Sequence, residues 1–128
     1  MNWSFDIVDS PGHIRIVTGG IFRADGYLSL LNELFDLPDW KLGMPLLFDN
    51  RKLYITKASP GELIRSADDI VSFNGELAFT RISVLYDTAE SMAAASRFGM
   101  IVDSRSSARI KRFLNEVHAL DWITRNGD

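Results

Sequence analysis

Three polar residues that follow a short apolar run are the first candidates for chemistry. Asp49, Asn50 and Arg51 come directly after the run 45–48, Pro-Leu-Leu-Phe. Such a run is typical of a strand buried on both faces of a parallel sheet, so we expect the three residues at the carboxyl end of a central strand. Open α/β sheets bind their ligands at that end. The alternative is structural, with Asp49 accepting backbone N–H groups and pairing with Arg51.

Further polar groups are expected at the same rim. The stretch 59–62, Ser-Pro-Gly-Glu, is typical of a helix start, with a capping box and proline at the first position. A phosphate at such a start would meet free N–H groups and a favourable dipole, which makes Ser59 a candidate phosphorylation site. The alternative is that Ser59 only caps its helix. The predicted partner- or ligand-binding rim comprises Asp49, Asn50, Arg51, Ser59, Asp87 and Thr88.

The sequence carries no complete catalytic, metal or nucleotide-binding motif. It has no cysteine, which excludes disulfides and thiolate metal sites. His13 and His118 are the only histidines, and they lack the spacing of a helical zinc motif. Neither a G-x-S-x-G elbow nor a glycine-rich phosphate loop is present. We therefore expect a non-enzymatic protein with no catalytic residue, metal or cofactor.

Length and composition indicate one ordinary globular domain over residues 1–128. Hydrophobic residues make up 46% and charged residues 24% of the chain, which favours a folded core over disorder. No apolar run approaches the roughly 18 residues of a membrane span, and residues 1–6 do not resemble a signal peptide. We expect a cytoplasmic protein with at most peripheral membrane contact.

The net charge of −3 argues against nucleic-acid binding. One basic cluster is present, and we interpret it as a solvated strand edge and loop. It consists of Arg105, Arg109, Lys111 and Arg112.

The elements that must position these residues alternate between strand and helix. Residues 3–8 and 14–17 predict an antiparallel hairpin around a Pro-Gly turn, with Gly19 and Gly20 ending the second strand. Further strands are predicted at 45–49, 77–86 and 110–113. Helices are predicted at 24–37, from Ser59 to about residue 74, from residue 87 or 88 to between 98 and 103, and after Asn115. This order predicts an α/β fold with one mixed, mostly parallel five-stranded sheet and about four helices.

Three stretches carry a family resemblance that spans about Ile14 to Ile123. The first is 16–19, Ile-Val-Thr-Gly, with a helix soon after. The second is 38–51, in which Pro-Asp-Trp, Gly-Met-Pro, an apolar strand and Asp-Asn-Arg follow one another. The third is a closing strand and terminal helix with Phe113, Ala119, Trp122 and Ile123. In this order and spacing they resemble the STAS-like family, also called SpoIIAA-like or STAS/SEC14 domains.

The resemblance implies a fold of successive βα units and non-enzymatic roles. Some members of this family antagonise anti-sigma factors and bind a partner kinase. Phosphorylation of a serine switches these members between states. Others resemble SEC14 domains, which bind lipids in an apolar pocket. The switch-type members carry Asp-Ser-Ser-Gly or Asp-Ser-Thr-Gly where this chain has Lys-Ala-Ser-Pro-Gly at 57–61. Only Ser59 matches the phosphorylated serine, and the acidic residue before it is absent.

We therefore expect a regulatory module that binds a partner protein through the predicted rim. The alternative is a binder of a small apolar or lipid ligand, in which the third helix forms a pocket wall lined by Met92, Phe98 and Met100. Trp40 is a candidate exposed anchor for a partner or a second copy, and an exposed edge strand would permit a homodimer. Each of these residues also has a purely structural interpretation. Met92, Phe98 and Met100 would then be ordinary core residues, and Trp40 would belong to a loop folded over the core.

Overall fold

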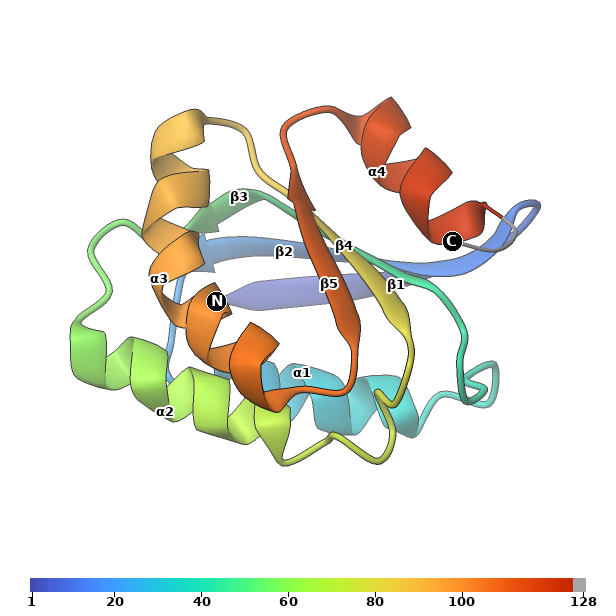
Figure 1. The fold of residues 1–128 in the computed structure, drawn as a ribbon, viewed down its shortest axis with the longest axis horizontal. Coiled ribbons are helices and arrows are strands. Elements are labelled where there is room, and N and C mark those ends of the chain that lie inside the picture. Colours follow the sequence, from blue (N-terminus) through green and yellow to red (C-terminus); the bar gives the residue numbers. More distant parts are fainter. Residues whose placement is uncertain (126–128) are drawn as a thin grey trace.

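The fold is a twisted five-stranded sheet with helices on both faces (Figure 1). The structure, a computed structural model, describes residues 1–125, except for the side chains at 98 and 101. Its strands are β1 (Asn2–Asp9), β2 (Gly12–Ile21), β3 (Leu46–Tyr54), β4 (Arg81–Leu85) and β5 (Arg109–Phe113). Its helices are α1 (Gly26–Phe35), α2 (Pro60–Val71), α3 (Ala89–Arg105) and α4 (Glu116–Thr124).

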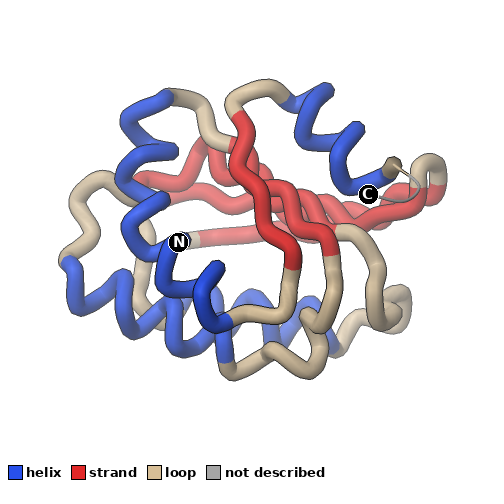
Figure 2. Tube along the Cα trace, in the orientation of Figure 1, coloured by secondary structure: helices blue, strands red, loops and turns tan. Residues whose placement is uncertain are grey.

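The strands lie side by side in the order in which they occur in the chain. β1 and β2 form an antiparallel hairpin, and β2, β3, β4 and β5 run parallel to one another. Because neighbouring strands in a sheet are rotated in a constant sense, β5 crosses the direction of β1 in Figures 1 and 2. The predicted α/β class, the mixed, mostly parallel sheet and the four helices are confirmed.

The strand order determines which face each helix covers. Parallel strands are joined by right-handed crossovers, so successive crossovers in one direction place α1, α2 and α3 on the same face. That face carries the main apolar core, with β-strand side chains such as Ile16, Phe48 and Ile82. The opposite face is covered by α4, where Ala119 and Ile123 pack on Leu47 of β3. β3 is therefore buried on both sides, as its apolar run predicted.

Two strand boundaries differ from those expected. Gly19 and Gly20 do not end β2, because pairing with β3 resumes at Gly19 after a bulge that follows Val17, and Gly20 adopts a φ of +77°. Glycine takes this conformation without steric cost, so the strand continues to Ile21. In contrast, the strand expected at 77–86 begins only at Arg81, because residues 73–79 form turns after α2.

The helix starts follow their capping residues. Ser59 accepts a hydrogen bond from the Glu62 backbone N–H while the Glu62 carboxylate accepts one from the Ser59 N–H, which is the predicted capping box. Thr88 caps α3 and Asn115 caps α4, each through its side-chain oxygen. These bonds satisfy backbone donors that would otherwise lack a partner at a helix start.

Trp40 is a core-packing residue. Its ring packs edge-on against Phe35, with 4.9 Å between centroids, and contributes to the main core. This partial burial matches the structural reading of a loop folded over the core.

Candidate functional site

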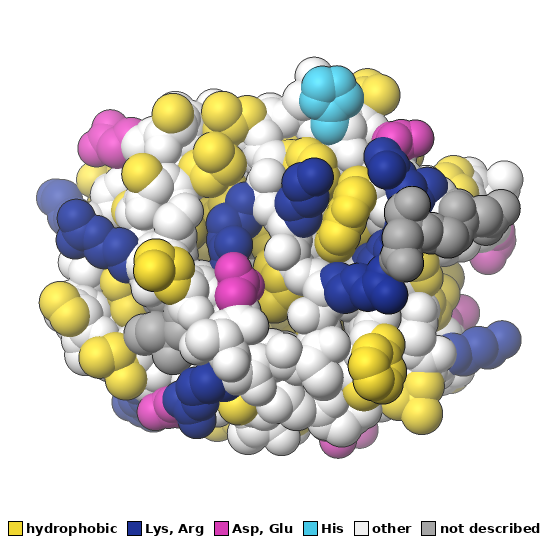
Figure 3. All heavy atoms as spheres, in the orientation of Figure 1, with side chains coloured by type: hydrophobic (Ala, Val, Ile, Leu, Met, Phe, Trp, Pro, Cys, Tyr) yellow, Lys and Arg dark blue, Asp and Glu magenta, His cyan; other side chains and the backbone are white. Residues whose placement is uncertain are grey.

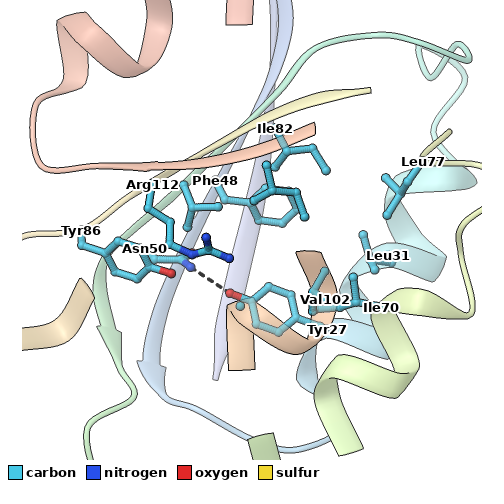
Figure 4. A pocket seen from close by; sticks show the side chains of 13 residues that line it. Tyr27, Leu31, Phe48, Asn50, Ile70, Leu77, Ile82, Tyr86, Val102 and Arg112 are labelled. Atoms are coloured by element: carbon cyan, nitrogen blue, oxygen red, sulfur yellow. Dashed lines mark hydrogen bonds between the residues drawn. The ribbon is translucent and has the colours of Figure 1, made fainter. Parts of the chain in front are cut away.

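A cavity of about 60 Å³ lies between the sheet and the helices α1, α2 and α3 (Figure 4). Nearly all of its wall is apolar. In the view of Figure 4, Leu31, Leu77 and Ile82 form one side, and the polar groups of Asn50, Tyr86 and Arg112 gather on the other. The thirteen lining residues are Tyr27, Leu31, Phe48, Asn50, Ile70, Leu77, Ile82, Val84, Tyr86, Gly99, Val102, Ile110 and Arg112.

A buried hydrogen-bonded chain forms part of the polar side. The Thr18 hydroxyl donates to Asn50 Oδ1 at 2.6 Å, and Asn50 Nδ2 donates to the Tyr27 hydroxyl oxygen at 2.8 Å. These side chains come from β2, β3 and α1, so the chain ties the first helix to the centre of the sheet. Buried amides and hydroxyls need such partners, because an unpaired one costs about 1–3 kcal/mol.

Tyr86 follows β4 and remains a neutral phenol at physiological pH. Burial raises its pKa to about 12, although the positive charge of Arg112 favours the phenolate. A neutral phenol keeps its own hydrogen and can donate it. Within residues 1–125, no hydrogen bond donated by this hydroxyl is found.

Arg112 closes the cavity at the edge strand. Its guanidinium donates to the carboxylate of Asp103 on α3 at 3.1 and 3.2 Å, and its side chain is only 19% exposed. The guanidinium lies so close to Gly99 that a Cβ on that residue would overlap it. The glycine in the middle of α3 therefore provides the space that Arg112 occupies.

The predicted rim residues lie on two sides of the sheet. Asp49 and Arg51 point toward α4, whereas Asn50 points into the cavity, because alternate residues of a strand face opposite ways. β3 continues to Tyr54, so the three residues lie in mid-strand. The expectation that they end a strand was wrong because only the pairing of β3 with β4 stops at Asp49, while its pairing with β2 continues to Tyr54.

Asp49 is the centre of an ion cluster beneath α4. Arg51 binds its carboxylate through two nitrogens at 2.9 and 2.8 Å, and Arg15 binds it at 2.6 Å. Burial opposes the ionisation of Asp49, but the hydrogen bonds from the two arginines outweigh it, so the pKa of this carboxyl lies below its ordinary value. Glu116 of α4 pairs with Arg15 at 2.6 Å. This arrangement matches the structural alternative for Asp49.

Three rim residues meet at an open hollow on the surface. Arg51, Asp87 and Thr88 line it together with residues at the end of β3 and the start of α3. Ser59 is exposed at the start of α2 and is not among the residues that line this hollow. The six residues therefore do not form one site.

Sequence reasoning missed most of the cavity's polar side. Tyr27 was not singled out within the helix predicted at 24–37, and Arg112 was assigned to a basic cluster. The arginines of that cluster separate in space, since Arg105 pairs with Asp68 of α2 while Arg112 turns toward the cavity. On the face of the molecule that Figure 3 shows, basic and acidic side chains are interspersed. The available signal was Gly99, a glycine inside a helix that marks a close approach.

The expected pocket residues are also different. Met100 is 71% exposed, and Met92 packs on the core without lining the cavity. The side chain of Phe98 lies outside the described residues. The third helix does form a cavity wall, through Gly99 and Val102.

Ser59 provides a test of the capping box alone. We expect Ser59→Ala to lower the free energy of unfolding by about 1 kcal/mol, because the Glu62 N–H loses its acceptor. Ser59→Asp keeps an acceptor at the N-cap and should remain close to the wild type. Urea unfolding of the three proteins measures both effects, and an equal loss in both variants would contradict the capping role.

The described residues contain no group of three acidic or histidine side chains that could hold a metal ion. None of the helices in residues 1–125 has the length and apolar character needed to cross a membrane.

Comparison with solved structures supports the fold assignment. No protein-family model matches the chain, and no curated protein matches it. The fold is similar to the crystal structure of an uncharacterised DUF3478-family protein with a SpoIIAA-like fold from Shewanella loihica. The TM-score is 0.62 at 17% identity, over 95% of this chain and 92% of that one. The chain therefore has the STAS/SpoIIAA-like fold that its sequence motifs predicted.

Proposed function

We propose that this chain is a non-enzymatic binding module that holds a small, mostly apolar molecule in the cavity beneath α3. The observation that carries this proposal is the cavity itself, with its apolar wall and a single polar side. Binding pockets combine these features, because apolar contacts supply affinity and a few polar groups fix orientation. A void left by imperfect packing would have no reason to gather an arginine, an asparagine and two tyrosine side chains.

The cavity volume sets the size of the molecule. A water-sized group occupies about 10–15 Å³ by the same measure, so about 60 Å³ accommodates roughly four to six non-hydrogen atoms. Pockets for drug-sized ligands are commonly about 300–1,000 Å³. The geometry thus favours a small molecule over the lipid that the SEC14-like reading suggested.

A cavity-filling substitution tests this proposal. We expect Val84→Phe to abolish ligand binding, because its ring would occupy the space beside Ile82 and Ile110. Val117→Phe is the matched control, since Val117 is 74% exposed on α4 and does not line the cavity. Native mass spectrometry of gently purified protein should show a small added mass in the wild type and control, which denaturation releases, and none in Val84→Phe.

Two outcomes would contradict the cavity as the binding site. A mass adduct retained by folded Val84→Phe would place the ligand elsewhere. A clean chain mass in all three proteins, with no small probe binding in solution, would favour the partner-binding function, for which the hollow beside Arg51, Asp87 and Thr88 is the candidate surface. The same spectra would show a protein partner or a second copy of the chain.

A further inference from the structure

The cavity places a positive charge against apolar walls. Arg112 is the one cationic side chain among the residues that line it. An isolated charge in such surroundings is costly, and proteins place one there when it has a partner. Asp103 is that partner on the outer side, but its carboxylate is 41% exposed. Solvent therefore screens the attraction between Arg112 and Asp103, and an ion pair of this kind contributes about 0–1 kcal/mol to stability.

Tyr86 and Arg112 both line the cavity and lie on its polar side in Figure 4. Asp103 engages the two terminal nitrogens of the guanidinium. A guanidinium has five N–H donors and a neutral tyrosine has one O–H donor. The two side chains thus present convergent donors beside an apolar cavity, and an anionic oxygen satisfies them better than a neutral one does.

We propose that the ligand of this cavity is a short-chain carboxylate whose head group is bound by Arg112 and Tyr86. This inference rests on the proposed function and specifies the ligand's chemistry. The hydrocarbon tail lies against Leu31, Leu77 and Ile82, at the side away from the polar groups in Figure 4. A four-carbon carboxylate has about six non-hydrogen atoms, which is the upper limit for this volume.

Glycine at position 99 follows from the same arrangement. Any side chain there would overlap the guanidinium and drive it out of the position from which it reaches both Asp103 and the cavity. Gly99 is therefore a positioning residue for the proposed head-group site, and Arg112 is its specificity-determining residue.

The experiment compares a charged probe with its neutral counterpart. Butyrate and butyramide have the same size and shape, and NMR titration of labelled protein measures the binding of each. We expect the wild type to bind butyrate at least ten times more tightly than butyramide. This preference should be lost in Arg112→Gln and reduced severalfold in Tyr86→Phe, while butyramide binding changes little.

Lys111→Gln is the matched control. It removes one positive charge from the same strand, but Lys111 faces the α4 side, over the Phe113 ring. The butyrate preference should survive in this variant, and an equal loss in Lys111→Gln would show that surface charge alone attracts the anion and overturn the inference. Equal binding of both probes by the wild type would overturn the head-group site while the proposed function stands. If neither probe binds in the cavity, the short-chain ligand is wrong and, with no adduct in native mass spectrometry, so is the proposed function.

Discussion

Asp49→Ala is expected to lower the free energy of unfolding by about 3 kcal/mol, because it removes the shared partner of two arginines. The Asp49 side chain is only 10% exposed, and the Arg15 side chain is 22% exposed. Without the carboxylate, Arg15 keeps Glu116 alone, and Arg51 approaches that residue only at 3.6 Å. Chemical unfolding of the variant measures the loss.

A surface ion pair is the control for this prediction. Asp121 and Arg125 pair at 2.9 Å one turn apart on α4, and both are well exposed. Asp121→Ala should change stability by at most about 0.5 kcal/mol. Losses of similar size in the two variants would show that the Asp49 cluster is no more stabilising than a solvated pair.

The contribution of Asp49 should depend on pH with a defined sign. Its folded-state pKa lies below the ordinary value of 3.8, so the folded protein binds this proton less readily than the unfolded chain does. The stabilisation is therefore complete above the unfolded-state pKa and is lost as the pH falls through the folded one. The difference in stability between wild type and Asp49→Ala should shrink in acid, and a difference that stayed constant would contradict this origin.

Asn50→Ala is expected to lower the free energy of unfolding by about 2–3 kcal/mol. The substitution leaves the buried hydroxyls of Thr18 and Tyr27 without the amide between them. Asn32→Ala is the control, because Asn32 is exposed on α1 and should change stability by about 0.5 kcal/mol or less.

A double-mutant cycle separates this network from simple loss of volume. Thr18→Val removes the hydroxyl that donates to Asn50 at nearly constant shape. The two substitutions together should cost at least about 0.5 kcal/mol less than the sum of their separate effects, because the second no longer breaks a bond. Strict additivity would indicate that the hydrogen-bonded chain contributes little.

The sequence was most informative for features that depend only on neighbouring residues, such as the starts of helices. The capping box at Ser59 and the caps at Thr88 and Asn115 depend on a few neighbouring residues, and all three are present. The buried run before Asp49 correctly indicated a central strand. The β-strand boundaries failed where pairing partners decide them, as at Gly19, because a bulge is invisible until the neighbouring strand is in place.

The candidate site was harder to predict than the fold. Asp49 and Asn50 are neighbours in sequence, but the pleat of β3 sends them to different sites on opposite faces of the sheet. The polar side of the cavity combines side chains from α1, β3, β5 and the end of β4, far apart in the chain. Arg112 looked like one member of a charged strand, since nothing near it in sequence shows that Gly99 opens a space above it.

The position of α4 has a consequence for synthesis of the protein. Each parallel strand pairs with the one made just before it, so the sheet can grow in the order in which the ribosome delivers it. The three earlier helices cover one face as they emerge. The other face, with Leu47 at its centre, gains Ala119 and Ile123 only when α4, the last of the four helices, has emerged. Until then the nascent protein presents an apolar sheet surface to the cell, the kind of surface that chaperones shield.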